Sequence, residues 1–513
     1  MHLDQHAVTT PDKPAIIMGE SGLSVSFGRL VERSRRLAHH LRGCGLKAGD
    51  GIAFLLENRP EFFDLAWAAQ RLGLYYTPIN GHLQPAEAGY ILRDCGAKLF
   101  ALSDLLARQV PALVQSAAGI GHLLSVGGAH PGFVPFEEAL AAASTAPLDG
   151  EIEGSAMLYS SGTTGQPKGI RRLLPQQRFG SLPIPMPALA LQALYGFDPA
   201  TVYLSPAPLY HAAPLAFSMT VQRCGGTVVV MERFDPLEAL RLIERHRITH
   251  LQMVPTHFVR LLKLSETERR RYDLSSLKLA IHAAAPCPID VKERMIDWWG
   301  PIISEYYSST EGAGFTAIDA AEWLAHKGSV GKPAPGTVRI VDEAGAVLPP
   351  GQPGTLYFQM AQRFEYHNDP AKTDGAYDSA GFASVGDIGY LDAAGYLFLT
   401  DRRSHMIISG GVNIYPQEAE NVLTLHSAVA DVAVIGVPDA EFGEAVKAVV
   451  VPTDPRAAGP ALAQVLLDYC RDHLAHYKCP RSIDFSAELP RLPTGKLLKR
   501  RLRDRYWPKN PER

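Results

Sequence analysis

The chain has 513 residues, of which 46% are hydrophobic and 20% are charged, and its formal net charge is −3. This balance argues against a general nucleic-acid binder, and no apolar run approaches the length of about 18 residues needed to span a bilayer. The first residues lack the order of charged, apolar and small residues that marks a secretion signal. The six cysteines form no CxxC pair, so we expect reduced thiols in a cytoplasmic protein rather than a zinc or redox site.

The first elements predict a βαβ unit. Residues 26–42 have helical periodicity, and Gly43 is a natural end for that helix. A strand is expected over 51–56, a helix over 61–73 and a second strand over 74–79, which implies parallel pairing of the two strands. The inward face of the first helix would consist of Leu30, Ser34, Leu37, Ala38 and Leu41.

The same alternation returns further along the chain. Residues 227–231 read as a strand, and a helix begins at Asp235 with Pro236 in its first position. Residues 249–254 and 277–283 read as further strands. We therefore predict an α/β protein whose large N-terminal domain has parallel-type sheets and flanking helices.

The composition of the sequence changes near residue 400, where charged residues, a glycine pair and shorter apolar runs begin. We predict a small α+β domain at residues 402–513, which follows a first domain at residues 1–401. Its expected elements are a helix from Pro416, strands over 428–438 and 445–452, and a helix over 460–474.

The stretch YSSGTTGQPKGI at residues 159–170 is the first motif with a chemical meaning. It is not a Walker A sequence, but successive N–H groups of a glycine-rich turn form an anion-binding nest. Its hydroxyls add donors, and its lysine adds one positive charge. This pattern predicts a loop that holds the phosphates of a nucleotide. The residues that would do so are Ser160, Ser161, Gly162, Thr163, Thr164, Gly165 and Lys168.

The whole stretch resembles the signature loop of the adenylate-forming superfamily, which includes acyl-CoA synthetases, aryl-CoA ligases, adenylation domains of peptide synthetases and luciferases. The resemblance implies that the loop holds the β- and γ-phosphates of ATP. The resemblance also implies a role for HAAAP at residues 282–286, where Ala284, Ala285 and Pro286 would line the adenine pocket.

The stretch SEYYSSTEG resembles the aromatic-Gly-x-Thr-Glu motif of that superfamily. By resemblance, Tyr307 stacks on adenine, Thr310 contacts the α-phosphate and Glu311 holds Mg²⁺, an ion that prefers carboxylate and phosphate oxygens. By the same resemblance, Ser308 and Ser309 would belong to the nucleotide site. The chain departs from the motif at Ser308, where glycine is usual, and we expect a modest change from this small residue.

Two residues near the expected domain boundary match further superfamily positions. Asp387 stands where a carboxylate accepts both ribose hydroxyls, which is a strong, orienting contact. Arg402 matches an arginine that contacts ribose and phosphate near the hinge. The hinge position usually carries Asp or Lys and here is Ser404.

The stretch PRLPTGKLLKR resembles the C-terminal loop that carries the adenylation lysine, here Lys496. The chemistry explains the need for it, because an ionised acid must attack a phosphorus surrounded by negative oxygens. An ammonium group between the carboxylate and the α-phosphate offsets this repulsion and stabilises the charge of the transition state.

The same resemblance implies that the small C-terminal domain is mobile, and this domain also carries candidate contacts for coenzyme A. The segment around Gly410 and Gly411 resembles the one lining the pantetheine tunnel, where glycine lets a thin arm pass close to the backbone. Phe442 stands where an aromatic residue borders the CoA site, and Lys478 is a candidate for a CoA phosphate. A core phenylalanine and a surface lysine are equally good interpretations of these two residues.

The acid pocket is expected at two places. His211 matches an aromatic or histidine position at the pocket mouth, and a neutral structural histidine is the alternative. The floor would consist of Gly312, Ala313, Gly314 and Phe315, small or apolar residues that leave room for an extended acid. We see no fixed cation for a second carboxylate, so a medium- to long-chain or an aryl acid is expected.

Together these matches cover essentially the whole chain and imply an AMP-forming acyl-CoA synthetase that uses ATP, Mg²⁺ and CoA. The catalytic residues would be Lys496, Thr310, Glu311 and His211. One alternative is a stand-alone adenylation enzyme that loads a carrier protein, and a more remote one is a nucleotide-binding protein without catalysis. A homodimer stays open, and no nucleic-acid partner is expected.

Overall fold

The computed structural model describes residues 3–160, 167–181, 186–334, 336–359, 363–402, 405–409, 412–491 and 497–507. The chain forms two compact units. The first comprises Met1–Met253, Val259–His282 and Gln362–Gly375, and the second comprises Val254–Phe258, Ala283–Ala361 and Ala376–Arg513. This division does not test the domain boundary expected between residues 401 and 402, which stays a prediction.

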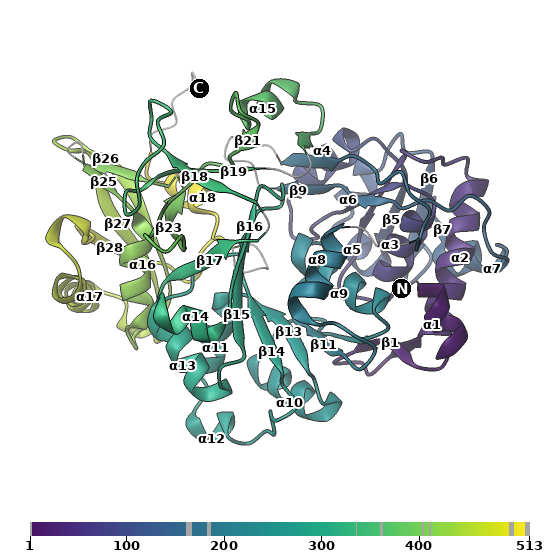
Figure 1. Cartoon of the computed structure of the whole chain (residues 1–513), viewed down its shortest axis with the longest axis horizontal. Helices are drawn as coiled ribbons and strands as arrows, with labels where there is room; N and C mark the ends of the chain where they lie inside the picture. The colour runs from purple at the N-terminus through teal and green to yellow at the C-terminus, as the bar shows by residue number, and fades with distance from the viewer. Residues whose placement is uncertain are drawn as a thin grey trace. The chain divides into compact units, whose positions relative to one another are not determined.

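The first unit contains a parallel six-stranded sheet in the order β7-β6-β5-β3-β4-β8. Helix α3 (Glu61–Arg71) connects β3 to β4, and these strands pair in parallel, so the predicted βαβ unit is confirmed. The purple and blue part of Figure 1 shows this sheet among its helices. Its strands are β3 (Gly51–Leu55), β4 (Tyr75–Pro78), β5 (Ala97–Ser103), β6 (His122–Val126), β7 (Val134–Pro135) and β8 (Ser155–Ala156).

Helix α2 (Phe27–Gly43) confirms the helix predicted at residues 26–42 and shows its physical basis. The Ser26 side chain accepts a hydrogen bond from the Arg29 N–H and so caps the first turn. The five residues of the predicted inward face are all buried, and the helix ends at Gly43 as expected. The other helices that precede the phosphate motif are α1 (Leu3–Thr9), α4 (Pro85–Asp94), α5 (Asp104–Gln109), α6 (Ala112–Ser116) and α7 (Phe136–Ala141).

A second run of strands in the first unit has the order β14-β13-β11-β12-β1-β2. Its pairs are parallel except for β1 with β2. Asp235 caps α10 (Pro236–His246) by accepting from the Glu238 N–H, as the sequence predicts. The strands are β1 (Pro14–Met18), β2 (Ser24–Ser26), β11 (Val202–Ser205), β12 (Thr227–Val230), β13 (His250–Met253) and β14 (Leu279–His282). Three more helices of this unit are α8 (Met186–Tyr195), α9 (Ala212–Arg223) and α12 (Glu266–Arg269), and α11 (Pro255–Leu262) follows β13.

A small antiparallel sheet completes the first unit and carries the ends of the phosphate motif. It has the order β20-β10-β9, with β9 at Leu158–Ser160, β10 at Lys168–Arg172 and β20 at Phe364–Tyr366. Helix α15 (Pro370–Gly375) follows β20.

The second unit begins with an antiparallel run of strands in the order β18-β19-β22-β23-β17-β16-β15. Helix α13 (Ile289–Trp299) precedes β15, and α14 (Ala320–Ala325) follows β16. The strands are β15 (Ile303–Ser308), β16 (Phe315–Ile318), β17 (Ser329–Pro333), β18 (Val338–Val341), β19 (Gly354–Gln359), β22 (Asp387–Leu391) and β23 (Leu397–Arg402), with β21 (Phe382–Ala383) beside β19.

The C-terminal part of the second unit is built on a long hairpin of β26 (Val429–Asp439) and β27 (Gly443–Pro452), drawn in yellow-green in Figure 1. These strands match the two predicted there, and α17 (Pro460–His473) matches the predicted helix. Alternate residues of the hairpin pack with residues of α16 and α17 in one core, which includes Leu423, Val432, Val434, Ala448, Val450 and Leu466. The remaining elements are β24 (Ile407–Ser409), β25 (Val412–Ile414), α16 (Pro416–Leu425), β28 (Ser482–Phe485) and α18 (Lys499–Arg503).

Candidate active site

The phosphate motif begins and ends on paired strands. Ser160 is the last residue of β9, Lys168 is the first of β10, and the two face each other in the antiparallel register. The Lys168 ammonium lies 5.2 Å from the centre of the Tyr366 ring on β20. The predicted phosphate residues between them, Ser161, Gly162, Thr163, Thr164 and Gly165, lie outside the described part of the chain.

A polar cluster behind this hairpin ties it to α4. The Tyr159 hydroxyl donates to Asp94 Oδ2 at 2.6 Å, and burial raises the pKa of this phenol, as does the Asp94 contact. The His367 N–H donates to the Gly169 carbonyl at 2.8 Å, and the Asn368 side chain donates to Asp94 Oδ1 at 3.2 Å. Asp94 carried no signal in the sequence, whereas Tyr159 is the first residue of the phosphate motif.

His211 occupies the N-cap position of α9 in the first unit. Its side chain makes no capping hydrogen bond, and its ring lies 4.4 Å from the ring of Tyr210. Both residues are half-buried, and burial raises the pKa of the Tyr210 phenol. A role of His211 at the mouth of an acid pocket stays a prediction.

The small-residue stretch of the second unit has an unusual backbone. Ala284 has φ of 77°, in the left-handed region that a residue with a Cβ rarely adopts. Ala284, Ala285 and Pro286 are all exposed. Strained, exposed backbone of this kind is more common at ligand sites than elsewhere, and it is compatible with the predicted adenine contact.

Strand β15 brings two predicted nucleotide residues together. The Tyr307 hydroxyl donates to Asp387 Oδ2 at 2.5 Å across 80 positions of the sequence, and Asp387 is only 5% exposed. The Tyr307 ring also lies 5.9 Å from that of Phe358 on β19, a residue that no sequence motif singles out. Arg402 is opposite Asp387 in the register of β22 and β23, so their backbones are neighbours.

The turn after β15 carries the predicted Thr310 and Glu311, both half-buried. Gly314 has φ of 80°, and a Cβ there would overlap the Phe358 ring, so only glycine fits without movement. Phe315 begins β16 and stacks on Tyr306 with 5.3 Å between ring centres. In the predicted pocket floor, Gly312 and Gly314 are half-buried and Ala313 is buried.

A buried ion pair supports β15 from its other end. Lys292 on α13 donates to Glu305 Oε2 at 2.7 Å, with side chains 0% and 6% exposed. The Lys292 ammonium also lies 4.6 Å from the centre of the Trp323 ring. The pair fixes α13 against the strand that ends in Tyr307 and Ser308.

Two of the predicted CoA residues, Phe442 and Lys478, lie in the described part of the chain. The Phe442 ring is half-buried, with the Arg481 guanidinium 4.1 Å from its centre. Lys478 donates to Glu418 Oε2 at 2.5 Å. Burial lowers the pKa of this lysine, but the hydrogen bond and charge of Glu418 more than offset that and leave it raised. Gly410, Gly411, Lys496 and the hinge residue Ser404 lie outside the described residues.

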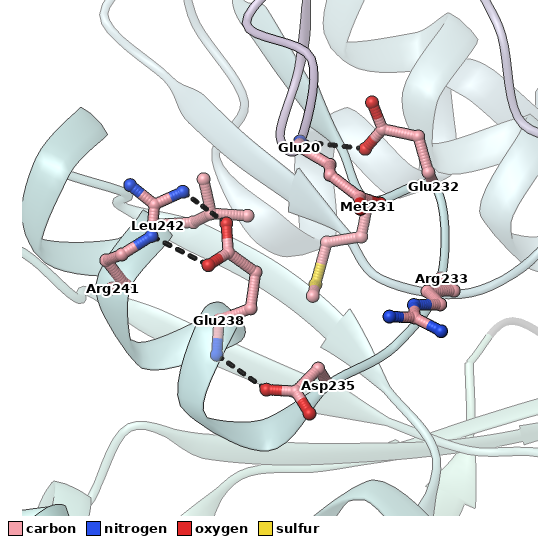
Figure 2. Close-up of a pocket in the computed structure, with 8 residues that line it drawn as sticks. All are labelled: Glu20, Met231, Glu232, Arg233, Asp235, Glu238, Arg241 and Leu242. Atoms are coloured by element: carbon pink, nitrogen blue, oxygen red, sulfur yellow. Dashed lines mark hydrogen bonds and ion pairs between the residues drawn. The ribbon is translucent and has the colours of Figure 1, made fainter.

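A separate hollow of about 290 Å³ lies in the first unit. Figure 2 shows two pairs among the groups that line it: the Glu20 N–H donates to Glu232, and Arg241 pairs with Glu238. Asp235 there serves as the cap of α10. None of the predicted site residues lines this hollow, and we do not assign the reaction to it.

Three negative findings apply to the described ranges. They contain no group of three or more His, Cys, Asp or Glu side chains arranged for a metal ion. None of their helices is both long and apolar enough to cross a bilayer. The six cysteines form no disulfide.

Comparison with known proteins gives two family matches. Residues 3–365 match the model of the AMP-binding enzyme family, and residues 418–496 match the model of the AMP-binding enzyme C-terminal domain. Feruloyl-CoA synthase of an Amycolatopsis species is 34% identical over 510 residues, which is 98% of each chain. Fatty acid–[acyl-carrier-protein] ligase ScoC of Streptomyces coeruleorubidus is 30% identical over 98% of this chain and 95% of its own. The structure of o-succinylbenzoate CoA synthetase from Bacillus subtilis with its acyl-adenylate intermediate is 28% identical, with a TM-score of 0.82 over 98% of this chain and 97% of that one.

Proposed function

The chain belongs to the AMP-binding enzyme family, and we propose that it is an AMP-forming ligase that joins a carboxylic acid to the thiol of coenzyme A. The observation that carries the proposal is the contact between Tyr307 and Asp387. These are the residues expected at adenine and ribose, and they lie within a hydrogen bond of each other although 80 positions separate them.

ATP would be oriented by three groups of residues. Tyr307 offers a ring face to adenine, while Asp387 accepts hydrogen bonds from the ribose hydroxyls. The hydroxyls and N–H groups of the motif between Ser160 and Lys168 would hold the phosphates. Because the Tyr307 hydroxyl donates to Asp387 at 2.5 Å, the carboxylate is fixed before ribose arrives.

In the first half-reaction a carboxylate oxygen of the acid attacks the α-phosphorus of ATP. The bond from that phosphorus to the bridging oxygen breaks, and pyrophosphate leaves with the electron pair. Thr310 would contact the α-phosphate, and Lys496 would neutralise the charge that builds up between acid and phosphate.

In the second half-reaction the thiol of CoA gives its proton to water and the sulfur attacks the acyl carbonyl. The carbon–oxygen bond to the phosphate breaks, and AMP leaves. AMP is a good leaving group, whereas a free carboxylate could react with a thiol only by expelling oxide, which is a very poor one. The acid must therefore be converted to its adenylate first. The segment around Gly410 and Gly411, together with Phe442, would admit the thiol arm.

Mg²⁺ fits this scheme as an ion that arrives with ATP. The described residues hold no cluster of three metal-binding side chains, so most of its ligands would be phosphate oxygens and water, with Glu311 as the protein ligand. The ion would supply charge neutralisation at the phosphates.

For the acid we propose an aryl or a medium- to long-chain substrate, with aromatic acids as the first choice. The expected pocket floor includes Phe315, which is stacked on Tyr306 and offers an apolar surface. The relative named feruloyl-CoA synthase acts, by its name, on an aromatic acid.

A panel of acids with ATP, Mg²⁺ and CoA tests the function. We expect acid-dependent release of pyrophosphate and formation of AMP and one acyl-CoA, measured by a coupled assay and by mass spectrometry. Absence of acid-dependent pyrophosphate release across aryl, medium-chain and long-chain acids would contradict the proposal.

A second candidate is a ligase that loads a carrier protein, because one relative of similar coverage carries that name. The same panel with a holo carrier protein in place of CoA separates the two. Acyl transfer to free CoA supports the first proposal, and transfer to the carrier alone supports the second.

A further inference from the structure

Ser308 stands where the superfamily motif has glycine, and its hydroxyl makes a contact that glycine lacks. Ser308 Oγ donates to the Gly314 carbonyl at 2.9 Å, with a longer contact of 3.5 Å to the Ser309 carbonyl. The side chain is half-buried. The hydroxyl therefore bonds within its own loop.

The position of this bond makes it a brace across the base of a loop. Ser308 is the last residue of β15 and faces Phe315, the first residue of β16. A bond from Ser308 to the Gly314 carbonyl therefore joins the two ends of loop 309–314.

Ser309 adds two contacts inside the same loop. Its carbonyl accepts the Gly312 N–H at 2.9 Å, and its hydroxyl accepts the Ala313 N–H at 3.3 Å. Two adjacent serines thus restrain a short loop from its base and from its middle. Such local bonds lower the number of conformations that the loop samples.

The loop carries the two residues expected to contact the nucleotide phosphates and their ion. Thr310 and Glu311 lie between the braced positions and are half-buried. At the far end Gly314 is packed against Phe358, which in turn lies beside the Tyr307 ring. A shift of the Gly314 carbonyl would thus move the loop that carries Thr310 and Glu311, and through Phe358 it would also alter the packing of the Tyr307 ring.

We propose that Ser308 is a positioning residue, which acts through the Gly314 carbonyl to hold Thr310 and Glu311 in the conformation that receives ATP. The inference rests on the proposed function, because the placing of these two side chains matters to activity only if the chain binds ATP. The brace itself does not depend on any ligand.

Strand β15 provides a matched control at its other end. Ser304 Oγ donates to the Ile318 carbonyl on β16 at 3.2 Å, and the residue is 7% exposed. Ser304→Ala therefore removes the same kind of bond from the same hairpin, away from loop 309–314. It should lower stability without altering the loop.

Hydrogen exchange without any ligand tests the brace. We expect Ser308→Ala and Ser308→Gly to speed exchange of the Gly312 and Ala313 amides about three- to tenfold, the worth of one net hydrogen bond. Ser308→Thr, which keeps the hydroxyl, should restore slow exchange, and Ser304→Ala should leave these amides unchanged. Equal exchange rates in wild type and Ser308→Ala would overturn the proposal.

Exchange of labelled pyrophosphate into ATP tests the consequence for function. Ser308→Ala and Ser308→Gly should raise KM for ATP about three- to tenfold, with a smaller change in KM for the acid, and Ser308→Thr should recover most of the loss. An unchanged KM for ATP despite faster amide exchange would reduce the brace to a structural role and overturn the positioning proposal. If wild type shows no acid-dependent exchange, the proposed function fails, while hydrogen exchange still decides on the brace.

Discussion

Asp387 is a buried carboxylate whose orientation is set by a phenol, and this makes it the sharpest test of nucleotide recognition. Hydrogen bonds to a charged acceptor contribute about 1.5–3 kcal/mol, so we expect Asp387→Asn to raise KM for ATP about 10- to 100-fold. Wild type should also prefer ATP to 2′-deoxy-ATP, and this preference should shrink in the variant. Pyrophosphate exchange at varied nucleotide concentration measures both effects.

Asp392 offers a control carboxylate in the turn that joins β22, the strand of Asp387, to β23. It accepts the N–H groups of Ala394 and Tyr396 at 2.9 and 2.8 Å and so closes a turn. Asp392→Asn should lower the melting temperature and leave KM for both nucleotides unchanged. If the two variants lost ATP affinity equally, Asp387 would not be the ribose acceptor.

Gly314 leads to a second prediction at this scale. Alanine there suffers both from φ of 80° and from overlap with the Phe358 ring. The backbone term costs about 1 kcal/mol and overpacking about 1–3 kcal/mol, so Gly314→Ala should lower the free energy of unfolding by about 2–4 kcal/mol. Gly345 has φ of 85° and open space where a Cβ would lie, so Gly345→Ala measures the backbone cost alone.

Chemical unfolding of the two variants measures the difference. Gly345→Ala should lose about 1 kcal/mol, and Phe358→Leu should relieve part of the Gly314→Ala defect because the smaller side chain makes room. Equal losses at Gly314 and Gly345 would show that the Phe358 contact is relaxed in solution.

Single residues are predictable where a motif marks them, but the contacts between them are not. Tyr307 and Asp387 were marked by their motifs, but the contact between them was not, because it depends on how β15 and β22 are brought together. Phe358 and Asp94 had no local signal at all, since each acts through residues far away along the chain. The motif predicts only a modest effect of serine at position 308, and the bond from its hydroxyl to Gly314 becomes visible only once the loop is folded.

At the scale of elements, helix α1 provides a test of pH dependence. Asp4 is paired with Arg71, whose side chain is fully buried, and with Arg35 at 2.8 Å. Burial raises the pKa of this carboxyl, but hydrogen bonds and charges of the two arginines outweigh it and hold the pKa at about 2, below the ordinary 3.8. The stability from this contact is therefore fully present above pH 3.8 and is lost as pH falls toward 2.

We expect Asp4→Asn to lower the free energy of unfolding near pH 7 by about 2 kcal/mol, as a lowering of nearly two pKa units implies. The difference between wild type and variant should shrink between pH 4 and pH 2, values set by the two pKa limits. Denaturant unfolding at a series of pH values measures it. A difference that stayed constant into acid would mean that the Asp4 charge does not provide the stability.

Elements with strong local periodicity were predicted closely, and those defined by distant pairing were not. The capped helix α2 and the two strands β26 and β27 could be predicted from the sequence because each is determined by residues near one another. The sheet of β9, β10 and β20 joins strands separated by much of the chain. Short strands such as β20 carry too few residues to show an alternating pattern.

For the whole molecule, the family match spans both ends of the chain, and the proposed reaction likewise needs residues from both ends. Acid activation and thiol transfer make opposite demands. The first must bring positive charge to a negative phosphate, while the second must admit a neutral thiol to a carbonyl. A lysine that serves only the first demand should therefore be dispensable for the second.

Lys496 is the residue to which this argument applies. Loss of one preorganised charge contact at a transition state typically costs about 100- to 1,000-fold in rate, so Lys496→Ala should reduce pyrophosphate exchange by at least about that factor. Thioester formation from supplied acyl-adenylate and CoA should stay within about threefold of wild type, because the charge that develops as sulfur attacks lies on the carbonyl oxygen and no second anion has to approach the phosphate.

Lys447 controls for the loss of a lysine from the C-terminal part of the chain, since it pairs with Asp484 at 2.8 Å on neighbouring strands. Lys447→Ala should affect both half-reactions to the same small degree. If Lys496→Ala slowed both steps equally, the lysine would support the fold or the binding of adenylate in general. A selective loss of the first step would instead show that Lys496 acts in the attack on the α-phosphorus. It would also explain why the chain needs this ammonium group in addition to its nucleotide-binding motifs.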